Sequence, residues 1–219
     1  ASALTSTLTI PITIKPARNL PPRLTPTPIL VGQGESVTVD LTQMVDDPDD
    51  QAKNSFSYAV VKAPGGVDVS LDGYNLTVSG KKDQSKGPVG AITVSVDDGS
   101  GAVNADIPVT IVKSSKPLVT TTEARIKVNA GQTATVNLSE YTTNPFPDPL
   151  VVLDASVHVG QGTASGNGNV LSVTPKAGFH GNMTVVYRVM DATNDPDRVV
   201  QGRVVVKVLD RPDAPQNVT

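Results

Sequence analysis

The sequence contains no cysteine and no tryptophan, and its aromatic residues are four tyrosines and three phenylalanines. Without cysteine the chain can form no disulfide, no thiolate metal site and no thiol nucleophile. Without tryptophan it has few rings for the flat aromatic platforms that bind sugars. The two histidines are His158 and His180, whereas a metal or catalytic site needs several such groups and partners that orient them. We therefore expect that the chain is not an enzyme.

Charge of one sign and long hydrophobic runs are also scarce. Eighteen basic and 21 acidic side chains leave a net charge of −3, and like charges do not gather in long runs. Nucleic acids and anionic membranes attract basic surfaces, so neither is an expected partner. Apolar runs stay well short of the roughly 18 residues that a membrane span requires, and no charged and then apolar leader is present. We expect no membrane contact within this segment.

The sequence repeats itself at a spacing of 97 positions, which carries Val37–Leu41 onto Ala134–Leu138. The same spacing carries Ile107–Ile111 forward onto Val204–Val208 and backward onto Ile10–Ile14. A repeat of this length is too long for a solenoid unit and suits one small domain. The chain is therefore predicted to hold two similar domains.

Apolar residues recur at every second position in many short stretches, which is the period of a strand with one buried face. Turns rich in Gly, Pro, Asp and Asn separate six or seven such strands in each repeat, and this favours two packed antiparallel sheets over a closed barrel. The chain is predicted to be all-β. The positions predicted to face the cores include Val39, Leu41, Val94, Val96, Val136, Leu138, Val157, Val159, Tyr187 and Val189.

Proline-containing joints divide the chain into four predicted segments. These are 1–20, the terminal strand of a preceding domain and a linker; 21–115, the first sandwich; 116–211, the second sandwich; and 212–219, a linker and the start of a following domain. Pro21, Pro22 and Pro117 stiffen the joints. Because an unpaired hydrophobic strand is sticky, we expect residues 1–14 to be ordered by pairing, within this chain or with another copy.

Motifs in both repeats resemble those of bacterial immunoglobulin-like and cadherin-like tandem surface domains. The second repeat carries Val173-Thr174-Pro175, the turn Ala177-Gly178-Phe179-x-Gly181, and the strand pattern Tyr187-x-Val189-x-Asp191. The first repeat carries the acidic loop Asp46–Asp50 and the hairpin Val96–Gly101. Residues 212–218 are similar to the opening of a fibronectin type III domain. The resemblance implies two tandem immunoglobulin-like (Greek-key) β-sandwiches in an elongated arrangement.

The resemblance implies calcium as the candidate metal, because calcium-binding members of the cadherin-like group use acidic loops. The candidate ligands here are Asp47, Asp49, Asp50 and Asp98. Calcium takes six to eight oxygen ligands, which clustered carboxylates can help to supply. The alternative interpretation is a solvated turn built from Asp and Pro, with no cofactor at all.

A second acidic hairpin contains Asp191, Asp195 and Asp197. It lacks the central glycine and terminal glutamate of a calcium-binding helix loop. We expect it to form solvent-exposed ion pairs with Arg198 and Arg203 that contribute little energy.

The function expected from these features is structural. The chain is predicted to be a non-catalytic stalk or adhesive spacer within a larger bacterial cell-surface or secreted protein, and so extracellular. The expected partners are neighbouring domains of the same chain and a surface protein or glycan. The alternative is a carbohydrate- or protein-binding accessory module of a secreted enzyme, for which Tyr74 and Tyr141 are the candidate exposed rings.

Overall fold

The computed structural model describes residues 8–14 and 18–209. Strands dominate it, and the helical elements among the described residues are four short 3-10 turns. The predicted all-β fold is confirmed. Within the described residues, no helix has the length and apolar character that crossing a membrane would require.

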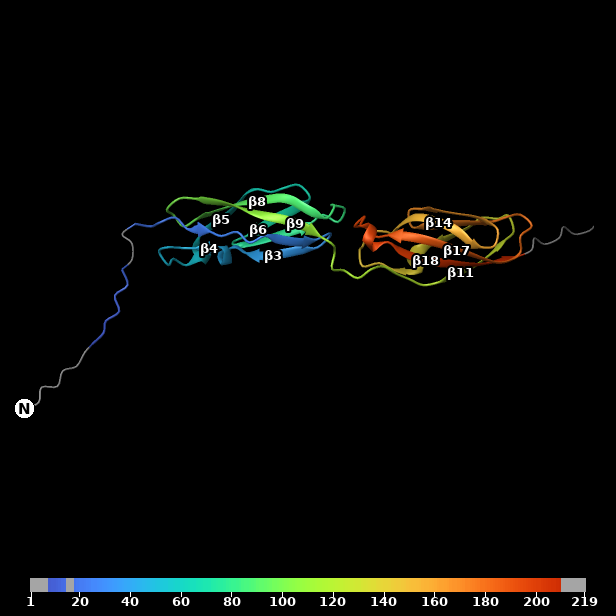
Figure 1. Cartoon of the computed structure of the whole chain (residues 1–219), viewed down its shortest axis with the longest axis horizontal. Coiled ribbons are helices and arrows are strands. Elements are labelled where there is room, and N and C mark those ends of the chain that lie inside the picture. Colours follow the sequence, from blue (N-terminus) through green and yellow to red (C-terminus); the bar gives the residue numbers. More distant parts are fainter. Residues whose placement is uncertain (1–7, 15–17, 210–219) are drawn as a thin grey trace, which may run out of the picture. The chain divides into compact units, whose positions relative to one another are not determined.

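The first repeat forms a four-stranded and a three-stranded sheet (Figure 1). The larger sheet has the order β2 (Ile29–Gly32), β9 (Val103–Val112), β8 (Gly87–Asp97), β5 (Ser57–Lys62). The smaller has the order β3 (Ser36–Asp40), β7 (Asn75–Gly80), β6 (Val67–Asp72), and β1 (Arg23–Leu24) pairs with β4 (Val45–Asp46).

The second repeat has the same plan. Its larger sheet has the order β11 (Ala124–Asn129), β18 (Val200–Leu209), β17 (Gly181–Met190), β14 (Val151–Val159). Its smaller sheet has the order β12 (Ala134–Asn137), β16 (Val170–Pro175), β15 (Gly162–Asn167), and β10 (Thr120–Thr121) pairs with β13 (Thr142–Thr143). Each sheet among the described strands draws on one repeat, so the sequence duplication corresponds to two sandwiches.

Equivalent residues produce equivalent local structure in the two repeats. Asp40 ends β3 and accepts a hydrogen bond from the backbone N–H of Thr42, which starts the 3-10 turn η1 (Leu41–Met44). Asn137 ends β12 and accepts from Ser139 N–H in the same way at η3 (Leu138–Glu140). A short polar side chain that caps its own backbone two residues on is a strong signal for such a turn.

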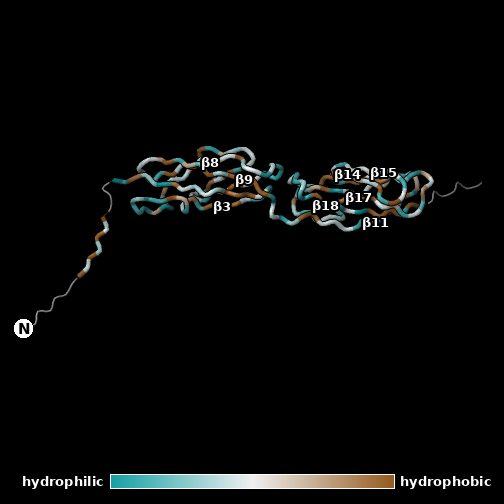
Figure 2. The backbone as a smooth tube through the Cα atoms, in the orientation of Figure 1, coloured by the Kyte–Doolittle hydropathy of each residue, from teal (hydrophilic) through white to brown (hydrophobic). Residues whose placement is uncertain are grey.

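Most of the predicted core positions are buried. Leu41, Val94, Val96, Val136, Leu138, Tyr187 and Val189 are at most 3% exposed, and Val39 is half-buried. Figure 2 shows hydrophobic and hydrophilic residues alternating along the strands of both repeats. The alternating pattern is therefore correct over most strands, because one face of each sheet packs against the other sheet.

The edge strand β14 departs from the predicted phase. Val159 is 50% exposed, although the alternation placed it toward the core. The pairing of β14 with β17 shifts register between Val152 and Asp154 and again between Val157 and Val159. An extra residue in one strand moves the following side chains to the other face, so the prediction for Val159 is wrong.

Residues 8–14 form no strand in this chain. Of the two pairing modes expected for the N-terminal residues, pairing within the chain is therefore wrong for this segment, and pairing with another copy stays a prediction. Residues 1–7 and 212–219 lie outside the described residues, as does the predicted start of a fibronectin type III domain.

The chain divides into two compact units. The first comprises Ala1–Ile29, Val37–Val78 and Pro88–Thr110, and the second comprises Leu30–Ser36, Ser79–Gly87 and Ile111–Thr219. The second unit thus contains the second sandwich, the linker that precedes it, and segments of the first repeat that include most of β2 and the ends of β7 and β9. The predicted elongated arrangement of the sandwiches stays a prediction.

Candidate functional site: the linker clamp and the acidic loops

Glu35 holds one side of the linker Ser114–Pro117, which lies between β9 and β10. Its carboxylate accepts hydrogen bonds from Ser114 Oγ (2.5 Å), Ser115 N–H (2.6 Å) and Lys116 N–H (3.2 Å). Burial by itself raises the pKa of Glu35, but these hydrogen bonds outweigh it and the pKa is lowered. The ionised carboxylate of Glu35 therefore accepts hydrogen bonds from two backbone N–H groups of the linker.

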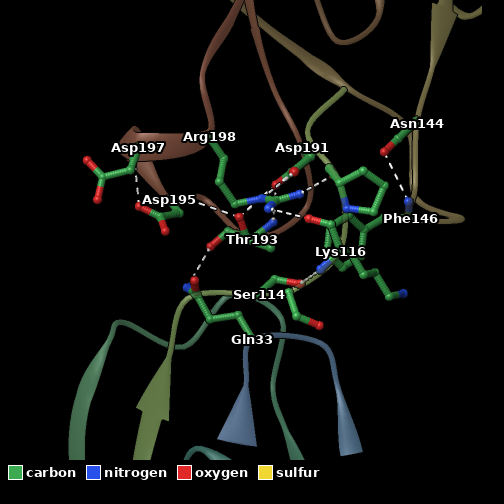
Figure 3. Close-up of polar contacts among 12 residues, drawn as sticks. Gln33, Ser114, Lys116, Asn144, Phe146, Asp191, Thr193, Asp195, Asp197 and Arg198 are labelled. Atoms are coloured by element: carbon green, nitrogen blue, oxygen red, sulfur yellow. Dashed lines mark hydrogen bonds and ion pairs between the residues drawn. The ribbon is translucent and has the colours of Figure 1, made fainter. Parts of the chain in front are cut away.

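Arg198 holds the other side of the linker and is 5% exposed (Figure 3). Its Nη1 and Nη2 donate to the carbonyl oxygens of Lys116 (2.9 Å) and Pro117 (2.8 Å), and its Nε donates to Asp191 Oδ2 at 2.8 Å. The planar guanidinium can bind three acceptors at once, which a lysine cannot do with the same geometry. We call Glu35, Asp191 and Arg198 the linker clamp.

Phe146 provides an aromatic surface beside the linker clamp. Arg198 Cζ lies 5.6 Å from the ring centroid and Lys116 Nζ lies 4.5 Å from it. Cations over a ring face are attracted by its quadrupole, so the ring stabilises both charges.

The loop Asp191–Arg198 is ordered by its own side chains. Asp191 Oδ1 accepts from Thr193 N–H and Oγ1, Thr193 Oγ1 accepts from Asp195 N–H, and Asp195 Oδ1 accepts from Asp197 N–H. Asp195 thereby caps the 3-10 turn η4 (Pro196–Arg198). This chain of short-range bonds presents Arg198 to the linker.

The prediction that this hairpin forms solvent-exposed ion pairs is wrong for Asp191 and Asp195, which are 1% and 2% exposed. Arg203 does not join the hairpin, because its guanidinium pairs with Glu123. A buried charge pair survives only when its remaining donors and acceptors are satisfied, and the linker carbonyls do this for Arg198. The spacing Asp-x-Thr-x-Asp, in which each side chain can cap the next backbone amide, was the signal available in the sequence.

Gln33 and Lys86 add further contacts to this loop inside the second unit. Gln33 Nε2 donates to the carbonyl oxygens of Gln84 (2.8 Å) and Thr193 (3.2 Å), and Lys86 Nζ donates to Asp195 Oδ1 at 2.9 Å. Burial raises the pKa of Asp195, but hydrogen bonds from Lys86 and Asp197 N–H and the charges of Lys86 and Arg198 lower it overall. Sequence reasoning missed Gln33, Glu35 and Lys86, because no local pattern marks residues whose partners lie far along the chain.

The predicted calcium ligands divide between turn formation and a small polar cluster. Asp47 is buried, and its carboxylate accepts from the N–H groups of Asp49 and Gln51, both at 2.9 Å. Asp50 adopts a left-handed backbone conformation, with φ 56°, and is exposed. These two residues shape the loop.

Asp49 and Asp98 both meet the segment Asn19-Leu20. Asp49 Oδ2 accepts from Leu20 N–H at 2.5 Å, and the backbone oxygen of Asp98 accepts from Asn19 Nδ2 at 3.2 Å. Asp49 Oδ1 and Asp98 Oδ2 are buried atoms without a hydrogen-bond partner. Across residues 8–14 and 18–209, no group of three or more His, Asp or Glu side chains is placed to hold a metal ion.

The remaining sequence candidates are the tyrosines Tyr74 and Tyr141 and the two histidines, and Tyr74 lines a shallow hollow. The hollow, of about 390 Å³, is lined by Asp40, Thr42, Gln43, Lys53, Asn54 and Tyr74. The Tyr74 ring packs edge-on against Tyr58, and burial followed by the charge of Asp40 raises the pKa of Tyr58 to about 12. Tyr141 and Tyr74 are both half-buried, and His158 and His180 are both exposed.

Residues 114–202 match the family model of the bacterial Ig domain. This match covers most of the second repeat, which is therefore similar to a bacterial immunoglobulin-like domain. The match begins at the clamped linker and ends inside β18, and it confirms the resemblance stated from the motifs. A search of the curated proteins found no match.

Solved structures that match this chain include titin, protocadherin and glycoside hydrolase chains. A crystal structure of the titin domains z1z2 in complex with telethonin is 13% identical over 89% of this chain and 99% of that chain, with a TM-score of 0.41. Human Protocadherin-24 EC1-2 is 11% identical over 89% of this chain and 100% of that chain, with a TM-score of 0.37. The endo-fucoidan hydrolase MfFcnA4 from glycoside hydrolase family 107 is 14% identical over 87% of this chain, with a TM-score of 0.35. This chain spans 29% of that hydrolase chain.

Proposed function

We propose that this chain is a non-catalytic spacer with an adhesive or stalk-like role in a larger bacterial cell-surface or secreted protein. Bacterial Ig domains are typically structural or accessory, generally non-catalytic and typically extracellular. The partners in this proposal are neighbouring domains of the same chain and a surface protein or glycan.

The observation that carries the proposal is the linker clamp. A spacer has to keep its linkers ordered, and here Arg198 and Glu35 hold the linker Ser114–Pro117 from two sides through hydrogen bonds to its backbone and to a serine hydroxyl. These hydrogen bonds are charge-assisted, which makes them stronger than hydrogen bonds between neutral groups. The buried ionisable groups of this unit therefore have a structural use that requires no substrate.

Backbone relaxation of the linker tests the spacer proposal. We expect ¹⁵N order parameters near the rigid-backbone value of about 0.85 at Ser115 and Lys116, and a fall toward about 0.6 in Arg198→Met. Arg125→Met is the matched control, because Arg125 is 78% exposed and pairs with Glu123 away from the linker. Low order parameters in the wild type, or no change in Arg198→Met, would contradict the proposal.

A second candidate function is glycan binding at the hollow around Tyr74. One aromatic ring beside several amide, hydroxyl and charged groups provides the stacking and hydrogen bonding that a sugar ring needs. Titration with soluble oligosaccharides should shift the amide resonances of Gln43 and Asn54, and Tyr74→Ala should abolish the shifts while Tyr141→Ala retains them. A glycan array without a signal removes this candidate.

Calcium binding at Asp49 and Asp98 is a separate proposal. It is supported by their two buried oxygens without hydrogen-bond partners, which a bound cation would neutralise. Two carboxylate oxygens are fewer than calcium requires, so backbone carbonyls and water would complete its shell. We expect calcium to raise the melting temperature of the wild type and to have no effect on Asp98→Asn. A melt that neither calcium nor a chelator changes would overturn the proposal.

A further inference from the structure

The segment Leu8–Ile14 has the composition of a buried strand but no partner in the described part of this chain. Its apolar residues alternate with Thr9, Pro11 and Thr13. All four apolar residues are largely exposed: Leu8 is 83% exposed, Ile10 67%, Ile12 82% and Ile14 88%. Figure 2 shows these hydrophobic residues spaced along the trace. A soluble protein rarely leaves such a run uncovered, so the segment marks an interaction site.

The repeat shows which strand this segment corresponds to. The shift of 97 positions carries Ile10–Ile14 onto Ile107–Ile111 of β9, and the two pentapeptides, Ile-Pro-Ile-Thr-Ile and Ile-Pro-Val-Thr-Ile, differ at one position. In β9 the first, third and fifth of these residues are at most 1% exposed, and Pro108 is exposed. Pro11 thus occupies a position at which the equivalent strand already accepts proline.

The second sandwich shows what surrounds such a strand. β18 lies between β11, with which it pairs in parallel, and β17, with which it pairs antiparallel. Val204, Val206 and Val208, the counterparts of the buried residues of β9, are at most 3% exposed there. A last strand of this kind therefore needs a slot with a hydrogen-bonding neighbour on each side.

Among the described strands, both such slots are already filled. β9 occupies the slot between β2 and β8, and β18 occupies the slot between β11 and β17. In its larger sheets, a second copy of the chain would offer only edge strands, β2 and β5 in one sheet and β11 and β14 in the other, and an edge strand supplies one hydrogen-bonding neighbour instead of two.

We infer that Leu8–Ile14 is the closing strand of a further immunoglobulin-like sandwich, and that it binds a sandwich body of this repeat type that lacks its own last strand. The segment enters that body as β18 enters the second sandwich, with Ile10, Ile12 and Ile14 facing the core. The inference deepens the proposed spacer function, on which it rests, because it identifies how this chain joins its neighbour.

The test supplies such a body. Residues 21–102, which are the first sandwich without β9, are fused ahead of the full chain, so that Leu8–Ile14 is the available last strand. Because Ile12 differs from Val109 by one methylene, the slot should accept it with little strain. We expect hydrogen exchange at the amides of Ile10, Ile12 and Thr13 to slow at least about tenfold relative to the unfused chain.

Two variants make the outcome decisive. Fusing residues 21–112, which retain β9, should leave the amides of Leu8–Ile14 fast, because the slot is filled. Ile12→Asp in the 21–102 fusion should restore fast exchange in the segment. If the segment stays fast in the 21–102 fusion, the inference is wrong.

Pairing with a second copy of the chain has a different signature. It would slow exchange in the unfused chain with a dependence on protein concentration, and that result would also overturn the inference. Relaxation of the linker at Ser115 and Lys116 tests the spacer proposal separately, so failure of one proposal can be told from failure of the other.

Discussion

Gly202 and Tyr187 face each other across β18 and β17. A Cβ atom on Gly202 would lie 2.2 Å from Tyr187 Cζ, so glycine is required for the ring to lie over this strand. We expect Gly202→Ala to lower the free energy of unfolding of the second sandwich by about 1 to 3 kcal/mol through overpacking, measured by urea denaturation. Gly65→Ala is the control, because a Cβ there meets nothing within 4 Å. Equal stability of the two variants would show that the ring moves aside.

The hydroxyl of Tyr187 is a buried polar group whose effect on stability can be tested with a single substitution. The side chain is fully buried, its Oη has no hydrogen-bond partner, and burial raises its pKa. Removing an unsatisfied buried polar group relieves a desolvation penalty, so Tyr187→Phe should leave the melting temperature unchanged or raise it. A clear fall in melting temperature would mean that a water molecule bonds the hydroxyl.

At the scale of elements, Glu35 of the linker clamp and the neighbouring Asp195 should make the second unit sensitive to acid. The pKa values of Glu35 and Asp195 are lowered in the folded protein from ordinary values of 4.5 and 3.8. Their contribution to stability is therefore complete above these ordinary values and is lost as the pH falls through the lower folded values. We expect the free energy of unfolding to decline below about pH 4.5, and to decline less in Glu35→Gln.

Glu140→Gln is the control for this prediction, because Glu140 is an exposed glutamate of the same unit. If Glu35→Gln and the wild type lose stability in parallel as the pH falls, the linker contacts do not depend on the ionised carboxylate. The lowered pKa of Glu35 would then contribute nothing to the acid sensitivity of the second unit.

At the scale of the whole molecule, the two repeats should unfold as separate events, because each has its own paired sheets. Stretching single molecules should give two force peaks, each releasing roughly 300 Å of chain for a repeat of 97 residues. Leu138 is fully buried in the second repeat, so Leu138→Ala should cost about 2 to 4 kcal/mol and weaken one peak while leaving the other in place. A single cooperative peak would show that the repeats unfold together.

The candidate site was predictable from the sequence only in part. The sequence marks the acidic residues Asp191, Asp195 and Asp49 as chemically notable, but it does not predict the burial of Asp191 and Asp195 or the partner of Asp49. Partners such as Glu35 and Lys116 lie about 80 residues apart along the chain, and local patterns carry no information about contacts at that separation. The spacing of Asp191, Thr193 and Asp195 could have predicted the internal hydrogen bonds of the loop, because each of those bonds joins residues two positions apart.

Local patterns in the amino-acid sequence were enough to predict the strands, the two repeats and the inward faces of most strands, including Val94, Leu138 and Val189. Successive side chains of a strand point to opposite faces of the sheet. A hydrophobic residue at every second position therefore indicates a strand with one buried face. The burial of Arg198 and Asp191 and the outward orientation of Val159 could be seen only in the folded chain. Those outcomes depend on which distant groups satisfy a buried charge and on where an edge strand gains a residue, and neither is a property of a single strand.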